Sequence, residues 1–205
     1  MTLKRIAILD GHPGAQSLSR RFTETYAAAA RDAGHDVRLI HLSDLEFDMD
    51  FGDGGYANWK PLEPQIEAVL GDLEWADHVV MSTPIWWGGL PAKLKGLLDR
   101  ILLPGRAYDT RNLNKMGMPS PLFTGKTGRI ILTSDSPRWF MRVAYGSAIL
   151  RQLSGQIFGF VGIKPTRFTY FAGASHPKNT GLPPWPTTIK TKKTTALIPS
   201  KFSKA

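Results

Sequence analysis

The chain of 205 residues contains no cysteine. This absence excludes disulfide bonds, thiolate metal sites, iron–sulfur clusters and a catalytic thiol. The chain also lacks a G-x-S-x-G nucleophile elbow and has no G-x-G-x-x-G after its first apolar run, which argues against a serine hydrolase and a Rossmann dinucleotide site. No metal site is predicted either, because no two of the five histidines have metal-ligand spacing: His12, His35, His41, His78 and His176.

Long apolar runs are missing as well. No stretch approaches the roughly 18 residues that a membrane helix needs, and the apolar run at residues 6–9 is too short for a signal peptide. The chain is 42% hydrophobic and 21% charged, which argues against disorder and suits one α/β domain. We therefore expect a soluble, cytoplasmic protein without an integral membrane segment.

Acidic residues are scarce at the end of the chain. The formal charge is +9, and residues 187–205 contribute +5 of it through five lysines and no carboxylate. Aromatic and basic residues are not interleaved, and neither zinc-finger nor basic-zipper spacing occurs, so no nucleic-acid partner is predicted. A solvated, disordered end is the ordinary interpretation of such a segment.

Strand-like and helix-like segments alternate through the first 175 residues, which predicts a parallel sheet with crossover helices. The expected strands are residues 5–10, 37–42, 79–82, 129–133 and 167–171. The expected helices are residues 17–33, 62–75, 91–102 and a segment around 149–157, whereas residues 43–60 and the segment around 105–108 are expected to form loops.

The chain after the fifth strand has no helical periodicity, although a domain of this type usually places another helix there. Residues 173–205 contain five prolines and a Thr/Lys-rich stretch. We therefore expect one domain over residues 1–175, followed by an extended or disordered Pro/Thr/Lys-rich tail over residues 176–205.

The loop after the first strand suits an anion. In open parallel sheets, ligands bind at the carboxyl ends of the strands. Here a glycine-rich turn opens a helix whose first N–H groups are unpaired. Ser17 and Ser19 add hydroxyls, and His12 adds a ring N–H donor. A purely structural interpretation remains open, in which Ser17 is only an N-cap and His12 a turn residue.

The loop after the third strand contains two adjacent tryptophans, Trp86 and Trp87, between Pro84-Ile85 and Gly88-Gly89. Burial of both rings in the core is difficult at an exposed turn. A planar aromatic ligand lying against Trp87 and the Ile85 backbone is the sharper interpretation.

These segments resemble a known family. The string TPIWWGGLPAKLKGLLDR at residues 83–100, followed by GRAY at 105–108, is similar to the flavodoxin-like NAD(P)H:quinone oxidoreductases. So is GHP at 11–13 followed by SLS at 17–19, and the resemblance extends over residues 4–173. It implies a flavodoxin-like, doubly wound α/β sandwich with a five-stranded parallel sheet in the order 2-1-3-4-5 and helices on both faces.

The resemblance also assigns cofactor contacts. In this family the positions of His12, Ser17, Leu18 and Ser19 hold the flavin phosphate. The positions of Pro84, Ile85, Trp86, Trp87 and Gly88 lie along the isoalloxazine. The family's third flavin loop usually reads Thr-Thr-Gly-Gly, whereas Thr133, Ser134 and Asp135 stand here, followed by Ser136. A carboxylate at Asp135 faces a reduced flavin unfavourably, unless its side chain points away.

The implied activity is transfer of a hydride from NAD(P)H through flavin N5 to a quinone-like acceptor, by a ping-pong mechanism. The cofactor is expected to be FMN, with FAD as the alternative, and the assembly a homodimer. Larger relatives use a tyrosine and a histidine after the third loop. Tyr145 is the candidate for the tyrosine, and no histidine lies between residues 79 and 175.

Two other classes share this fold. One-electron flavodoxin carriers are usually strongly acidic and lack the Trp-Trp-Gly-Gly-Leu-Pro string. Some relatives act instead as regulatory subunits on membrane transport proteins, and the basic tail suits docking on a partner or an anionic lipid surface. Turnover of NAD(P)H separates a reductase from such a regulator.

Overall fold

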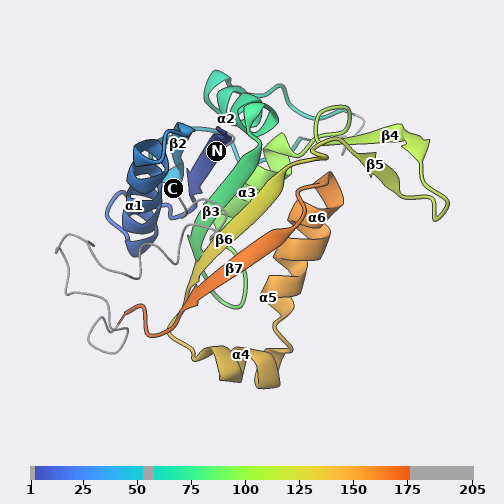
Figure 1. The fold of residues 1–205 in the computed structure, drawn as a ribbon. Helices are drawn as coiled ribbons and strands as arrows, with labels where there is room; N and C mark the ends of the chain where they lie inside the picture. The colour runs from blue at the N-terminus through green and yellow to red at the C-terminus, as the bar shows by residue number, and fades with distance from the viewer. Residues whose placement is uncertain (1–2, 53–57, 176–205) are drawn as a thin grey trace.

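A computed structural model of the chain describes residues 3–52 and 58–175. Its centre is a five-stranded parallel sheet in the order β2-β1-β3-β6-β7 (Figure 1). When the strands of this sheet are counted alone, this is the expected order 2-1-3-4-5. The strands are β1 (Arg5–Asp10), β2 (Asp36–His41), β3 (His78–Pro84), β6 (Thr127–Thr133) and β7 (Thr166–Phe171).

Helices pack on both faces of the sheet. On one face α1 packs against residues of β1, β3 and β6, and on the other face lie α2, α3 and the helical segments that precede β7. The elements are α1 (Leu18–Asp32), η1 (Leu42–Asp44), α2 (Pro64–Trp75), α3 (Ala92–Ile101), α4 (Arg138–Tyr145), α5 (Ala148–Arg151), the π-helical η3 (Gln152–Ile157) and α6 (Phe158–Val161).

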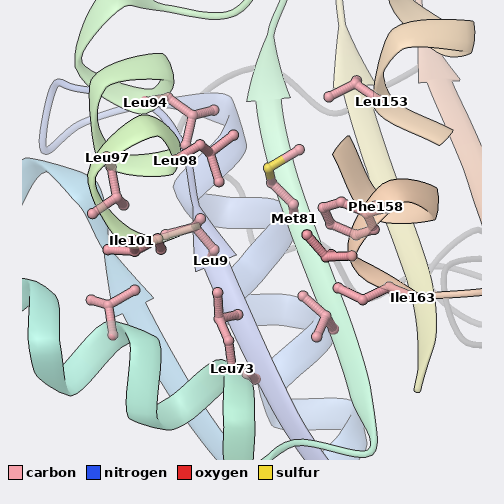
Figure 2. Packing of buried hydrophobic residues seen from close by; sticks show 14 of the residues in the cluster. Leu9, Leu73, Met81, Leu94, Leu97, Leu98, Ile101, Leu153, Phe158 and Ile163 are labelled. Atoms are coloured by element: carbon pink, nitrogen blue, oxygen red, sulfur yellow. The ribbon is translucent and has the colours of Figure 1, made fainter. Parts of the chain in front are cut away.

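The larger core lies between the sheet and α2, α3 and α6. Leu9 of β1 and Met81 of β3 belong to this core (Figure 2). Leu94 and Leu98 of α3 lie on one side of Met81, and Phe158 of α6 lies on the other. Every residue of β3 is buried, because both faces of this central strand are covered. This packing holds the carboxyl ends of β1, β3 and β6 in fixed positions.

The structure corrects three of the expected elements. The segment around residues 105–108, expected to be a loop, leads into a two-stranded hairpin of β4 (Tyr108–Leu113) and β5 (Pro119–Pro121). Most residues of β4 are exposed, and the pairing with β5 shifts in register between Asp109 and Leu113. The sequence of β4 therefore lacks the alternation of apolar and polar residues that predicts a strand. Pro91 is the N-cap of α3 rather than a residue of its first turn.

The expected helix around 149–157 is in fact a broken series of helical segments that begins at Arg138 and ends at Val161. Gly146 and Ser147 interrupt the series with left-handed backbone. The apolar residues of the whole segment therefore do not follow one continuous helical periodicity. The predicted tail over residues 176–205 lies outside the described residues. Within residues 3–52 and 58–175, no helix is both long and apolar enough to cross a membrane.

Candidate functional site

Three loops meet at the carboxyl edge of the sheet, after β1, β3 and β6. The N–H of Gly11 donates to the carbonyl of Ser82 at 2.7 Å, and the N–H of Ile85 donates to the carbonyl of Thr133 at 2.8 Å. A Cβ on Gly11 would lie 2.6 Å from a Leu94 methyl group and 3.1 Å from the Ser82 carbonyl oxygen, so a larger residue would require Leu94 of α3 to shift. The three loops are therefore fixed relative to one another, as expected from the strand order.

The loop after β1 is organised around His12. Its Nδ1 lies 2.9 Å from the Gly14 nitrogen and 3.1 Å from the Gly14 carbonyl oxygen, so it accepts the Gly14 N–H in one tautomer and donates to the carbonyl in the other. The edge of the His12 ring contacts Trp86, with ring centroids 5.5 Å apart and planes at 81°. His12 thus joins the first loop to the second, and neither contact with Gly14 uses its Nε2.

Helix α1 begins with two serines in different roles. Ser17 Oγ accepts a hydrogen bond from the N–H of Arg20 at 3.0 Å, so Ser17 is an N-cap. Ser19 is 1% exposed, and its Oγ has no hydrogen-bond partner among the described residues. The N–H groups of Leu18 and Ser19 have no acceptor inside the helix. This cluster of free donors suits a phosphate.

The loop after β3 is a tight turn. Trp86 and Gly89 exchange backbone hydrogen bonds of 3.0 and 2.9 Å. Between them Trp87 and Gly88 have φ values of 51° and 78°, the signature of a type I′ turn. A tryptophan in left-handed backbone is strained. The Trp87 side chain is fully exposed and Trp86 is 44% exposed, so neither is a core residue.

The free backbone donors of this turn lie at its tip. The Ile85 N–H is already bonded to Thr133, so it is not available to a ligand. Pro84 is the last residue of β3 and has no N–H to offer. Within the described part of the chain, the N–H groups of Trp87 and Gly88 have no acceptor. These two are the backbone donors that the turn presents.

The loop after β6 is tied to the end of β7. Thr133 and Ser134 are buried, and the N–H of Ser134 donates to the carbonyl of Phe171 at 2.9 Å. The carboxylate of Asp135 accepts hydrogen bonds from the N–H and the hydroxyl of Ser175, at 2.7 and 2.8 Å. The Asp135 side chain is therefore held by the chain that leaves β7.

Comparison with known proteins places the chain. A family described as having a flavodoxin-like fold matches residues 4–182. The chain belongs to this family. It is 27% identical over 161 residues to an FMN-dependent NADH:quinone oxidoreductase of Cereibacter sphaeroides, covering 78% of this chain and 72% of the relative.

Two further proteins are similar to this chain over most of their length. An uncharacterized NAD(P)H oxidoreductase of Haemophilus influenzae is 25% identical over 167 residues, covering 80% of this chain and 81% of the relative. The structure of an NAD(P)H:quinone oxidoreductase from Methanothermobacter marburgensis superposes with a TM-score of 0.69 at 20% identity, covering 84% of this chain and 88% of that one. At this identity, the likeness shows the fold.

Tyr145 is not joined to the three loops of this flavodoxin-like site. It is the last residue of α4, is mostly exposed, and its ring contacts Phe140 with centroids 5.6 Å apart. Among the described residues, no hydrogen bond or ring contact links it to His12, Trp86 or Thr133. Its catalytic role remains a prediction without geometric support in a single chain.

Sequence reasoning missed Asp10, the last residue of β1, whose side chain is completely buried under the first loop. Its Oδ1 accepts from the N–H of His12 at 3.2 Å, and its Oδ2 lies 3.4 Å from His41 Nδ1. Burial raises the pKa of the Asp10 carboxyl, and the contacts with His12 and His41 oppose the rise. The sequence signal that could have identified Asp10 is its position as a carboxylate at the end of an apolar strand.

Proposed function

We propose that this chain is an FMN-dependent oxidoreductase that accepts a hydride from NAD(P)H and delivers it to a quinone-like acceptor. One observation carries the proposal: a buried serine hydroxyl with no partner among the described residues stands at the start of α1, and His12 of the preceding loop contacts Trp86 in a turn with two exposed tryptophans. The names of the Cereibacter sphaeroides and Haemophilus influenzae relatives support the same chemistry. The proposed flavin-binding domain is residues 1–175.

In this proposal the FMN phosphate lies at the start of α1. Its oxygens accept hydrogen bonds from Ser19 Oγ, the N–H groups of Leu18 and Ser19, and the His12 Nε2–H. The observed hydrogen bonds fit this role because none among the described residues uses Ser19 Oγ, and the His12 tautomer that accepts the Gly14 N–H leaves Nε2–H free. Ser17 Oγ, by contrast, is already used as the cap. The positive end of the helix dipole adds to the attraction. Leu18 contributes only its backbone, since its side chain packs against the core.

The isoalloxazine lies along the turn after β3. Trp86 and Trp87 supply an apolar aromatic wall, and the N–H groups of Trp87 and Gly88 donate to the polar edge of the ring. Thr133 and Ser134 form the opposite border of the slot, with Asp135 held by Ser175. When bound, FMN supplies a hydride acceptor at N5 that the protein itself lacks. The side chains orient the reactants and exclude water from them.

We also propose that the slot is completed by a second copy of the chain. The Trp87 side chain is fully exposed in a single copy, and a flat aromatic slot needs cover from water to protect a reduced flavin. The homodimer is an expectation of the family resemblance, and light scattering on the FMN-loaded protein tests it. A monomer at micromolar concentration contradicts this part of the proposal.

A binding comparison tests the cofactor assignment. FMN, FAD and riboflavin are titrated into the purified protein, and flavin fluorescence is followed. We expect FMN to bind at least tenfold more tightly than riboflavin, because only FMN has the phosphate. Equal affinity for FMN and riboflavin overturns the assignment of the first loop. Binding of FMN without oxidation of NADH or NADPH favours the regulatory-subunit alternative instead.

A further inference from the structure

A second feature of the same edge is a hollow that is lined by arginines. Arg138 and Arg142 of α4 and Arg151 of α5 border a hollow of about 750 Å³ together with Trp139 and Ser147. We call it the arginine hollow. Among the residues that the structure describes, no carboxylate side chain lines it. Neither the three flavin loops nor the proposed hydride transfer uses any of these five residues.

Local backbone geometry brings the three arginines together. Arg138 and Arg142 are four residues apart on α4, so they share one face of the helix. The chain then reverses through two consecutive left-handed residues, Gly146 at φ 55° and Ser147 at φ 54°. This turn brings α5 back toward α4, and the Arg151 guanidinium donates to the Gly146 carbonyl. The third arginine is thereby fixed at the turn.

The positive charge in the hollow is not compensated locally. Arg138 and Arg142 are exposed and make no ion pair or hydrogen bond with any described residue. Arg106 offers a contrast, because it pairs with both Glu67 and Glu74. Residues 136–205 contain eleven Lys and Arg and no Asp or Glu, whereas residues 1–135 contain 15 basic and 17 acidic residues. The hollow therefore suits an anion, and planar guanidinium groups match phosphate geometry.

The hollow begins close to the third loop of the proposed flavin slot. Arg138 follows Asp135 by three residues, so its Cα is within about 11 Å of the third loop. Trp139 is 67% exposed on the wall of the hollow and offers an aromatic face to a flat base. A ligand that combines a flat base with phosphate, and that reaches from the flavin slot, fits both features. The nucleotide donor of the proposed reaction has this composition.

We propose that the arginine hollow binds the adenosine end of the nucleotide donor and selects NADPH by its 2′-phosphate. The phosphate lies between Arg138 and Arg142, and Trp139 stacks on the adenine. NADH lacks this phosphate, so it gains no charge-assisted hydrogen bond here. This inference rests on the proposed reductase function, whose donor preference it specifies.

Kinetics with both donors test the proposal. In R138Q/R142Q we expect the KM for NADPH to rise at least tenfold, whereas the KM for NADH and the kcat with either donor change less than twofold. K115Q is the matched control, since it removes an exposed charge from the β4–β5 hairpin. Wild-type protein that does not prefer NADPH, or equal effects on the two donors, overturns the proposal.

Direct binding keeps this test separate from activity. Calorimetry measures adenosine 2′,5′-bisphosphate and AMP binding to wild type, R138Q/R142Q and W139A. We expect the bisphosphate to bind at least tenfold more tightly than AMP only when Arg138 and Arg142 are present, and W139A to weaken both. If FMN fails to bind while the protein still prefers the bisphosphate to AMP, the reductase proposal is overturned, whereas the assignment of the hollow to a 2′-phosphate stands.

Two further measurements test whether the hollow instead binds a lipid headgroup or another protein. Wild-type protein is sedimented with vesicles of phosphatidylglycerol and phosphatidylcholine in equal parts, and its mass is measured by light scattering. If R138Q/R142Q loses vesicle binding but retains the bisphosphate, the hollow recognises a lipid headgroup and the proposal is overturned. A change of oligomeric state with unchanged nucleotide binding overturns it equally, because the hollow is then a protein interface.

Discussion

Asp135 and Ser175 form a clasp between the loops that follow β6 and β7: the carboxylate accepts the Ser175 N–H at 2.7 Å and the Ser175 hydroxyl at 2.8 Å. Related flavin loops usually have glycine at this position. Because Oδ1 accepts one of these hydrogen bonds and Oδ2 the other, the clasp turns the carboxylate toward the end of β7. It thereby allows an aspartate at the border of a proposed flavin slot.

The clasp predicts an order of effects for two variants. Asp135→Ala removes both hydrogen bonds, whereas Ser175→Ala removes only the one from the hydroxyl. We expect urea denaturation to show a loss of about 1 to 2 kcal/mol for Asp135→Ala and at most about half of it for Ser175→Ala. FMN affinity is expected to follow the same order. Equal effects of the two variants contradict the geometry.

Ser19→Ala separates binding from stability. We expect the Kd for FMN to rise about tenfold and the Kd for riboflavin to stay the same, because the lost hydroxyl contacts only the phosphate. The apoprotein is not expected to lose stability, since the Ser19 hydroxyl has no hydrogen-bond partner among the described residues. Ser17→Ala is the control. It removes the N-cap and is expected to lower the free energy of unfolding by about 1 kcal/mol.

Trp87→Gly tests the strained turn. Glycine adopts φ 51° without the cost that tryptophan bears, so thermal denaturation is expected to show a more stable apoprotein, by about 1 kcal/mol. FMN and acceptor binding are expected to weaken, because the aromatic wall is lost. A variant that is less stable than wild type contradicts the assignment of strain to this residue. Trp86→Leu, in ordinary backbone, is the matched comparison.

His78 predicts how stability depends on pH. Burial lowers the pKa of His78 to about 4, and its ring contacts Tyr26 and Thr127. The unfolded chain has the ordinary value of about 6.5 and binds this proton first. Stability from His78 is therefore complete above pH 6.5, and up to about 3 kcal/mol is lost as the pH falls toward 4. Denaturation at several pH values measures the slope, which His78→Gln should reduce; an unchanged slope contradicts the assignment.

Much of the sheet could be predicted from the sequence, because its signals are local. Apolar runs such as Ile6–Leu9 mark strands that are covered on both faces, and Gly34 follows α1 at φ 85°. The β4–β5 hairpin escaped prediction because it is mostly exposed and has no strand periodicity. Helix α4 escaped because only Met141 of its residues is buried.

The candidate site was predicted less evenly. The order of parallel strands brings the loops of His12, Trp86 and Thr133 together, and this follows from topology. The free donors depend on contacts that no motif encodes, such as the bond from Ile85 to Thr133. Asp10 and the arginine hollow likewise become visible only when segments far apart in the sequence, or turns with unusual backbone, are placed in space.

The central claim is that the three loops hold FMN for hydride transfer from NAD(P)H. Its most direct test is the visible spectrum of the FMN-loaded protein, before and after NADPH is added in the absence of oxygen. We predict that the oxidised flavin band bleaches and that a quinone restores it. A protein that takes up no FMN, or whose flavin band persists with both NADPH and NADH, contradicts the account.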